Sequence, residues 1–89
     1  MKTKSAPNNW YRYYAVVGSN GLAVMSTWEK AVSITMYMQK ERIKAFTNFE
    51  DAQAWAVFEF APQVPFGYYI PTPLKLNQAV FRKDLVSMH

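Results

Sequence analysis

The strongest constraint on the fold is a short turn-forming segment, Gly18-Ser19-Asn20-Gly21, between two apolar runs. The run before it, residues 13–17, reads Tyr-Tyr-Ala-Val-Val, and the run after it, residues 22–25, reads Leu-Ala-Val-Met. β-Branched and aromatic residues of this kind favour strands. An Asn-Gly pair between such runs is a strong hairpin signal, because a primed turn needs residues that accept a positive φ. The sequence therefore predicts a β-hairpin with a primed turn.

Two helices are predicted after the hairpin, each with a capping signal at its start. Ser26 and Glu29 have the spacing of a capping box, which predicts a first helix from Trp28 to about Gln39. Asn48 can cap a second helix, from Phe49 to about Phe60, whose first turn carries two acidic residues that suit the helix dipole. The expected inward-facing residues of this second helix are Ala52, Trp55, Ala56 and Phe58.

A third strand is predicted between the helices, at residues 42–46, because this stretch is short and alternating. The alternation places Arg42, Lys44 and Phe46 on one face. A buried Phe46 then requires either a bend after Lys44 or long cationic stems that reach past a sheet edge. The order is thus β-β-α-β-α, which predicts an α+β fold with a three-stranded antiparallel sheet packed against two helices.

The ends of the chain differ from this central domain, which we expect to span residues 10–60. Residues 1–9 are polar and read as a flexible arm. Residues 61–89 form a Pro-rich extension, in which residues 66–70 are expected to be extended, as an edge strand. A short third helix over residues 76–86, capped by Asn77, is predicted near the end.

Composition excludes several classes of function. The 89 residues include no Cys, and the single His is His89, so thiolate metal sites, disulfide scaffolds and histidine-based catalysis lack their residues. The six acidic residues fall mostly at predicted helix caps or on solvent faces. We therefore expect no enzyme activity, no catalytic residues, no metal site and no cofactor. A net charge of +4 favours an anionic partner. The absence of a signal-peptide pattern and of a membrane-spanning apolar run predicts a cytoplasmic or other intracellular location.

Several segments, taken in order, resemble one known family. They are Tyr13-Tyr14-Ala15-Val16, Gly18 and Gly21, Ser26-Thr27-Trp28-Glu29, Lys44-x-Phe46, and Glu50-Asp51-Ala52-x-x-Trp55-Ala56. Together they are similar to the hybrid-binding domain at the N-terminus of eukaryotic-type ribonuclease H, which also occurs in caulimovirus viroplasmin. The resemblance covers about residues 11–60. It implies the fold expected above and binding of RNA/DNA hybrid or double-stranded RNA by shape, across the minor groove.

The resemblance also implies roles for individual residues. Trp28 would pack on a deoxyribose, and Lys44 would contact a phosphate with Arg42 as a second cation. The main-chain amides of residues Thr27 to Glu29 would suit a phosphate oxygen. Trp28 can equally be a core residue, because a helix-terminal indole often packs internally. The two glycines would allow close approach of the hairpin backbone. The residues expected at the interface are Trp28, Arg42, Lys44, Gly18, Gly21 and Thr27.

This chain departs from the family pattern in its cations. The family hairpin usually carries several Lys or Arg, whereas residues 17–22 carry none. Ile43, Lys44 and Ala45 stand where an aromatic and two lysines are usual. Because duplex affinity depends largely on neutralised phosphates, fewer cations imply weaker binding. A stand-alone module of this kind suits a virus, a phage or a mobile element.

The alternative is a protein-interaction module with the same fold, which binds a host protein or a second copy of itself. Its surface would be the Pro-punctuated aromatic segment, residues 62–73, with Phe66, Tyr68 and Tyr69 as contacts. One structural feature separates the two hypotheses. A single exposed face holding Trp28, Arg42 and Lys44 favours nucleic acid, and a buried Trp28 with exposed Tyr68 and Tyr69 favours a protein partner.

Overall fold

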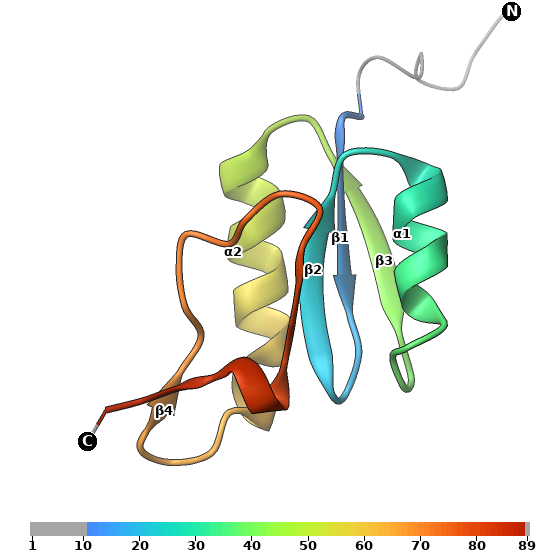
Figure 1. Cartoon of the computed structure of the whole chain (residues 1–89). Coiled ribbons are helices and arrows are strands. Elements are labelled where there is room, and N and C mark those ends of the chain that lie inside the picture. The colour runs from blue at the N-terminus through green and yellow to red at the C-terminus, as the bar shows by residue number, and fades with distance from the viewer. Residues whose placement is uncertain (1–10, 89) are drawn as a thin grey trace, which may run out of the picture.

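The fold has three layers, with one helix on each face of a central sheet. The computed structural model describes residues 11–88, so the arm expected at residues 1–9 lies outside the described range. Helix α1, Trp28–Thr35, lies on one face of the sheet, and helix α2, Phe49–Phe60, lies on the other (Figure 1).

The sheet has four antiparallel strands in the order β3-β1-β2-β5. The strands are β1 (Tyr13–Val17), β2 (Gly21–Met25), β3 (Arg42–Phe46) and β5 (Ala79–Phe81). The predicted α+β class, the hairpin and the third strand are confirmed. The predicted strand number is wrong, because a fourth strand from the C-terminal segment pairs with the free edge of β2.

The hairpin forms without the primed turn that the Asn-Gly pair predicted. Positive φ values among the described residues occur at Lys40, Gly67 and Asn77, and none falls within residues 18–21. Asn20 instead joins the turn to the connection between α1 and β3. Its side-chain amide donates to the carbonyl oxygen of Tyr37 at 2.9 Å, and its side-chain oxygen accepts from the amide of Gln39 at 3.0 Å. Long-range hydrogen bonds thus stabilise this turn.

Both helices form, and α1 begins at Trp28 as predicted, but its capping residue and its length differ from expectation. The N-cap is Thr27 rather than Ser26, and the Thr27 hydroxyl accepts a hydrogen bond from the amide of Lys30 at 3.1 Å. The helix ends at Thr35, four residues before the predicted end, because the chain turns back there toward the hairpin. Helix α2 has its predicted bounds, and the Asn48 side chain caps it by accepting from the amide of Asp51 at 2.8 Å.

The predicted third helix over residues 76–86 is wrong. This stretch contains β5, a single 3₁₀ turn (Arg82–Asp84) and β6 (Val86–Ser87). The unpaired edge of β2 accounts for the difference, since β5 satisfies the backbone groups that this edge would otherwise leave open. The extended segment expected over residues 66–70 is confirmed in part: β4 (Tyr68–Tyr69) pairs with β6, whereas Phe66 and Gly67 form a turn before it.

Strand alternation divides the buried residues between the two faces of the sheet. The α1-side core consists of Val16, Ala23, Met25, Ala31 and Met38. The α2-side core consists of Ala15, Val17, Leu22, Val24, Ala52, Ala56, Phe60, Ile70, Leu74 and Leu85. Trp55 packs against this second core, whereas Phe58, expected inward, is 74% exposed. Ile70, Leu74 and Leu85 make the C-terminal segment an integral part of the domain.

Candidate nucleic-acid interface

Trp28 lies at the first position of α1 and is 52% exposed. Its indole meets the ring of Tyr14 edge-on, with the ring centroids 5.9 Å apart and the planes at 68°. The alternative role of Trp28 as a buried core residue is therefore wrong. The Tyr14 contact holds the indole from the sheet side and leaves half of the residue available to a ligand.

A surface hollow of about 550 Å³ adjoins this indole. Its polar groups include the Tyr14 hydroxyl, which lies 3.4 Å from the carbonyl oxygen of Tyr11, and the Thr27 hydroxyl, which caps α1. The first-turn amides of a helix have no backbone partner within the helix, and in α1 the Thr27 hydroxyl accepts from the Lys30 amide, so the amides of Trp28 and Glu29 are the donors that a ligand can use. The residues that line the hollow are Tyr11, Tyr14, Ser26, Thr27, Trp28 and Glu29.

The two predicted cations lie on the other face of the sheet. Ile43 packs with the α1-side core, so its neighbours Arg42 and Lys44 point toward α2. Arg42 forms an ion pair with Glu59 of α2. The Lys44 ammonium lies 5.6 Å from the ring centroid of Phe46. Phe46 therefore shares the α2 side with Arg42 and Lys44, and packs against the core there. The two cationic side chains reach outward from the edge strand, so no bend after Lys44 is needed.

The structure therefore does not bring Trp28 together with Arg42 and Lys44. Trp28 belongs to the α1 side, whereas both cations belong to the α2 side. Arg42 is also at the opposite end of the sheet, because it pairs with Val17 while Tyr14 pairs with Ala45. The single face that would have favoured nucleic acid does not form, and the buried Trp28 that would have favoured a protein partner does not occur.

Gly18 and Gly21 are both buried within the chain, where neighbouring segments leave no room for a side chain. A Cβ added at Gly18 would lie 2.8 Å from the Cβ of Met38. A Cβ added at Gly21 would lie 2.6 Å from the ring of Phe81. These contacts give both glycines a packing role, and they place other segments where the resemblance expected an approaching nucleic acid.

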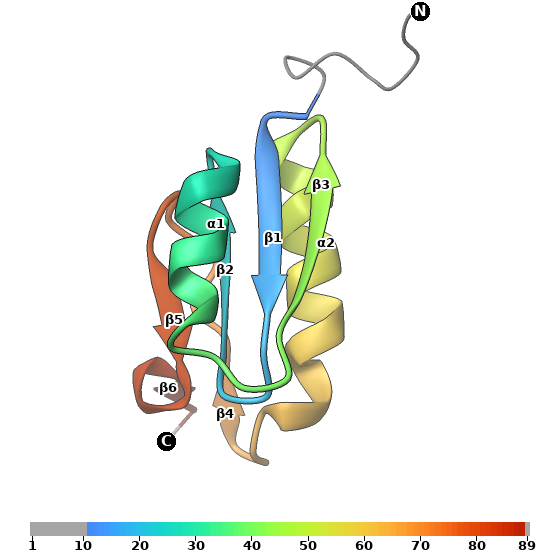
Figure 2. The same ribbon diagram turned by 90° about the vertical axis from the view of Figure 1, so that its right-hand side faces the viewer.

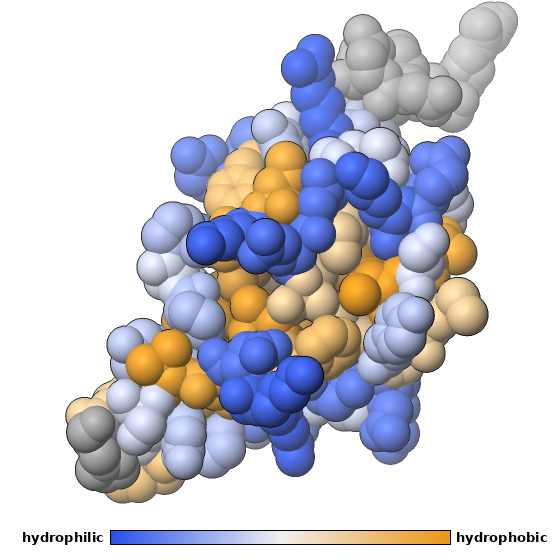
Figure 3. All heavy atoms as spheres, in the orientation of Figure 1, coloured by the Kyte–Doolittle hydropathy of each residue, from blue (hydrophilic) through white to orange (hydrophobic). Residues whose placement is uncertain are grey.

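Apolar side chains are exposed in two places. The sequence indicated Trp28 in the first and Phe66, Tyr68 and Tyr69 in the second as candidate contacts. Along α1, Trp28, Val32 and Met36 recur at every fourth residue and are all exposed, with Met36 at 81%. At the other end of the molecule Phe66 is fully exposed, and the neighbouring side chains of β4 are exposed too. Figure 3 shows apolar side chains at the surface, interleaved with hydrophilic ones.

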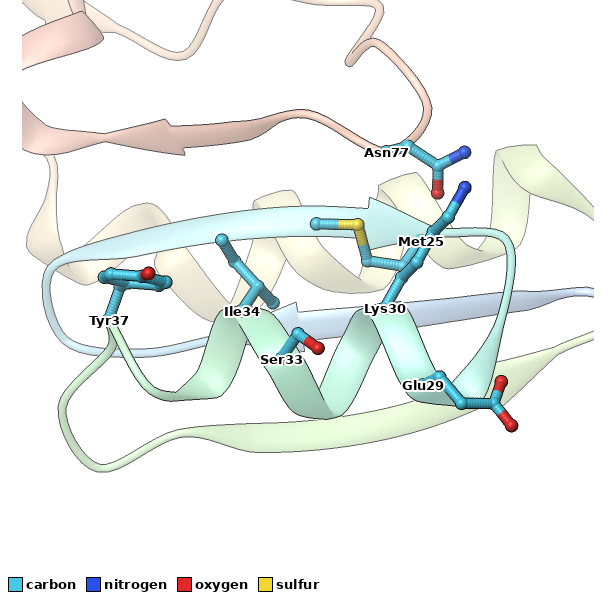
Figure 4. Close-up of a pocket in the computed structure, with 7 residues that line it drawn as sticks. All are labelled: Met25, Glu29, Lys30, Ser33, Ile34, Tyr37 and Asn77. Carbon is cyan, nitrogen blue, oxygen red and sulfur yellow. The ribbon is translucent and has the colours of Figure 1, made fainter.

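A groove of about 370 Å³ runs along the opposite side of α1, between the helix and the C-terminal segment (Figure 4). Met25 and Ile34 lie in its middle, with Tyr37 at the far end of α1 and Asn77 across from the helix. The Asn77 side-chain oxygen accepts a hydrogen bond from the amide of Ser26 at 2.8 Å. Sequence reasoning missed this groove, because the two residues that this bond joins are 51 residues apart. The remaining lining residues are Glu29, Lys30 and Ser33.

Comparisons of this chain with protein-family models, with curated proteins and with solved structures find no match. Within residues 11–88, no three or more carboxylate, imidazole or thiol side chains gather closely enough to hold a metal ion. Neither described helix has the length and apolarity needed to cross a bilayer. With no match to a known protein, the geometry around Trp28 is the observation that supports a candidate interface.

Proposed function

We propose that this chain is a non-catalytic module that binds RNA/DNA hybrid or double-stranded RNA through the surface around Trp28. The observation that carries this proposal is the exposure of the Trp28 indole, held edge-on by Tyr14 at the N-terminal end of α1. The position is the one that the family resemblance assigns to the sugar-packing aromatic. An indole kept in place by a neighbouring ring is suited to pack on a flat sugar or base surface.

The groups around Trp28 suit a sugar-phosphate backbone. Hydroxyls of Tyr11 and Tyr14 can exchange hydrogen bonds with 2′-hydroxyls, and the amides of Trp28 and Glu29 at the start of α1 can donate to a phosphate oxygen. These contacts read the shape of an A-form-like minor groove rather than its base sequence. The module would therefore distinguish hybrid and RNA duplexes from DNA duplexes.

Arg42 and Lys44 are excluded from this proposed contact surface, because they point toward α2. Lys30, exposed on α1, is the described lysine nearest to Trp28 in the chain, and Glu29 between them has the opposite charge. Few phosphates would be neutralised, so we expect weak binding with a shallow dependence on salt.

Fluorescence anisotropy with matched RNA/DNA hybrid, double-stranded RNA, double-stranded DNA and single strands tests the proposal. Trp28→Ala should weaken hybrid binding about tenfold, because one aromatic contact with a nucleotide contributes on the order of 1–3 kcal/mol. Phe58→Ala is the matched control, since Phe58 is an exposed aromatic on α2, across the sheet. Equal loss in both variants, or no binding of the wild-type chain at low salt, would refute the proposal.

A second candidate function is self-association through the C-terminal segment. The observation that favours it is the complete exposure of Phe66 beside the exposed Tyr68 and Tyr69. Sedimentation velocity over a range of concentrations tests this candidate. A mass that rises with concentration for the wild-type chain but not for Phe66→Ser would support it, and a constant monomer mass would exclude it.

A further inference from the structure

Strand β3 forms one edge of the four-stranded sheet, and among the strands of residues 11–88 it pairs with β1 alone (Figure 2). Within residues 11–88, no backbone or side-chain hydrogen bond reaches its outer edge. At five residues it is longer than β5, the three-residue strand at the opposite edge. An open edge of this length is a template for pairing with another strand.

The register identifies the backbone groups that this edge offers. The amide of Gly18 donates to the carbonyl oxygen of Gly21 at 2.8 Å, which makes these two a hydrogen-bonded pair. In an antiparallel ladder, hydrogen-bonded and non-hydrogen-bonded pairs alternate along the strand. Ala15 and Val17 are therefore not hydrogen-bonded to β2, and their N–H and C=O groups point toward β3, where they pair with Lys44 and Arg42. The N–H and C=O groups that point outward from β3 are therefore those of Ile43 and Ala45.

The side chains of β3 differ in character between its two faces. Ile43 and Ala45 are half-buried on the α1 side, where α1 packs on β1 and β2 and leaves β3 largely uncovered. Lys44 is exposed on the α2 side. Among the described residues its ammonium has no carboxylate partner, and it lies over the rings of Phe46 and Trp55 at 5.6 and 6.0 Å.

The charge of Lys44 decides what can pair with this edge. Since Ile43 and Ala45 provide the outward hydrogen bonds, Lys44 occupies a non-hydrogen-bonded position, where facing side chains approach most closely. A second copy paired about the middle of β3 would set Lys44 against Lys44, and like charges directly opposite are destabilising. A carboxylate at that position would instead form a cross-strand ion pair.

We propose that the outer edge of β3 binds an extended acidic segment of another protein as a fifth, antiparallel strand. The segment would carry a carboxylate opposite Lys44 and apolar residues opposite Ile43 and Ala45, which gives it an apolar-acidic-apolar pattern. Main-chain hydrogen bonds to Ile43 and Ala45 supply affinity, and Lys44 supplies selectivity. This inference does not depend on nucleic-acid binding around Trp28.

A labelled synthetic peptide with the sequence Thr-Val-Glu-Val-Glu, blocked at both ends, is the probe, and fluorescence anisotropy is the measurement. Lys44→Glu should weaken binding at least about tenfold, and a peptide with Lys in place of the central Glu should regain binding to that variant. Lys75→Glu is the matched control, because Lys75 is an exposed lysine of the C-terminal segment. Equal binding by Lys44→Glu and the wild-type chain would overturn the proposal.

A second variant tests the backbone contacts. Ala45→Pro removes the outward N–H while the ladder to β1 remains, since that ladder uses Lys44 and Arg42. It should abolish peptide binding with an unchanged circular dichroism spectrum, and the ¹⁵N amide signals of Ile43 and Ala45 should shift when peptide is added to the wild-type chain. Peptide binding without those shifts, or a wild-type dimer that Ala45→Pro dissociates, would overturn the proposal.

Discussion

Asn20 shows how one side chain can join a turn to segments distant in sequence. Its side chain makes two hydrogen bonds with the α1–β3 connection, and its carbonyl oxygen accepts from the amide of Arg82 at 3.0 Å. Three segments distant in sequence therefore meet at this residue. The sequence correctly indicated a turn here, but the reason lies in contacts 17 or more residues away, which local pattern analysis does not include.

Asn20→Ala should lower the free energy of unfolding by about 1–2 kcal/mol, because each lost hydrogen bond contributes about 1 kcal/mol. Ser19→Ala, the adjacent turn residue, is the control. Its amide donates to the carbonyl oxygen of Gln39, and that bond survives the substitution. Urea denaturation of both variants measures the difference, and equal stabilities would show that the Asn20 side chain is not needed.

The two hairpin glycines make a prediction about packing. Gly21→Ala should destabilise the fold by about 1–3 kcal/mol through overpacking, and Phe81→Ala should relieve part of that cost by removing the ring. Gly18→Ala should not be relieved by Met38→Ala, because the contacting atom is the Cβ, which alanine keeps. Double-mutant cycles by chemical denaturation measure both couplings. Similar couplings in the two pairs would contradict this packing role.

At the scale of elements, α1 begins at the predicted Trp28, but its capping residue differs from the sequence expectation by one position. Both Ser26 and Thr27 are good caps, and the spacing to Glu29 favoured Ser26. In the structure the amide of Ser26 donates to the Asn77 side chain, and Thr27 caps the helix. Ser26 is thus held by a contact from the C-terminal segment, and the neighbouring Thr27 is the cap.

Thr27→Ala should cost about 1 kcal/mol of unfolding free energy, the usual value of a lost N-cap, whereas Ser26→Ala should cost little. The Ser26 contact with Asn77 uses the backbone amide, which alanine retains. Thermal unfolding followed by circular dichroism compares the two variants. A larger loss of unfolding free energy for Ser26→Ala than for Thr27→Ala would contradict the Thr27 cap and support the capping box that the sequence predicted.

Asn77 fixes the path from the C-terminal segment into β5. It has a φ of 67°, its amide donates to the carbonyl oxygen of Val24 at 2.8 Å, and its side chain accepts from Ser26. Asn77→Gly keeps the backbone conformation but loses the side-chain bond, and Asn77→Ala loses both. Stability measured by urea denaturation should fall in the order Asn, Gly, Ala. Equal stability of the Gly and Ala variants would contradict this role for the backbone.

At the scale of the whole molecule, local sequence patterns predicted much of the three-layer fold, but they did not predict the fourth strand of the sheet. The hairpin, β3 and α2 were predicted within residues 13–60, although the turn is not of the primed type and α1 is capped by Thr27 instead of Ser26. The C-terminal strand was missed, because its partner is the edge of β2 more than 50 residues earlier, and residues 76–86 alone have helical spacing.

The candidate site was predictable in part, for the same reason. Alternation in β3 placed Arg42 and Lys44 on one face with Phe46, and that grouping is confirmed. Which helix covers that face depends on how α1 and α2 distribute about the sheet, and the sequence alone did not specify this. The separation of Trp28 from the cations is thus a property of the layers, not of any one segment.

The C-terminal segment should be needed for the whole fold. Ile70, Leu74 and Leu85 belong to the α2-side core, and β5 covers the edge of β2. A chain shortened to residues 1–61 would expose that core, so we expect loss of cooperative unfolding and binding of a dye specific for apolar surface. A shortened chain with a sharp thermal transition would show that the domain is complete without this segment.

The central claim is that the exposed face of Trp28 contacts a nucleic-acid duplex, and one measurement tests it most directly. In ¹⁵N NMR spectra the indole N–H signals of Trp28 and Trp55 report on opposite sides of the sheet. Addition of RNA/DNA hybrid should shift the Trp28 indole signal and leave the Trp55 signal unchanged. An unshifted Trp28 signal at saturating hybrid, or equal shifts of both indoles, would contradict the account.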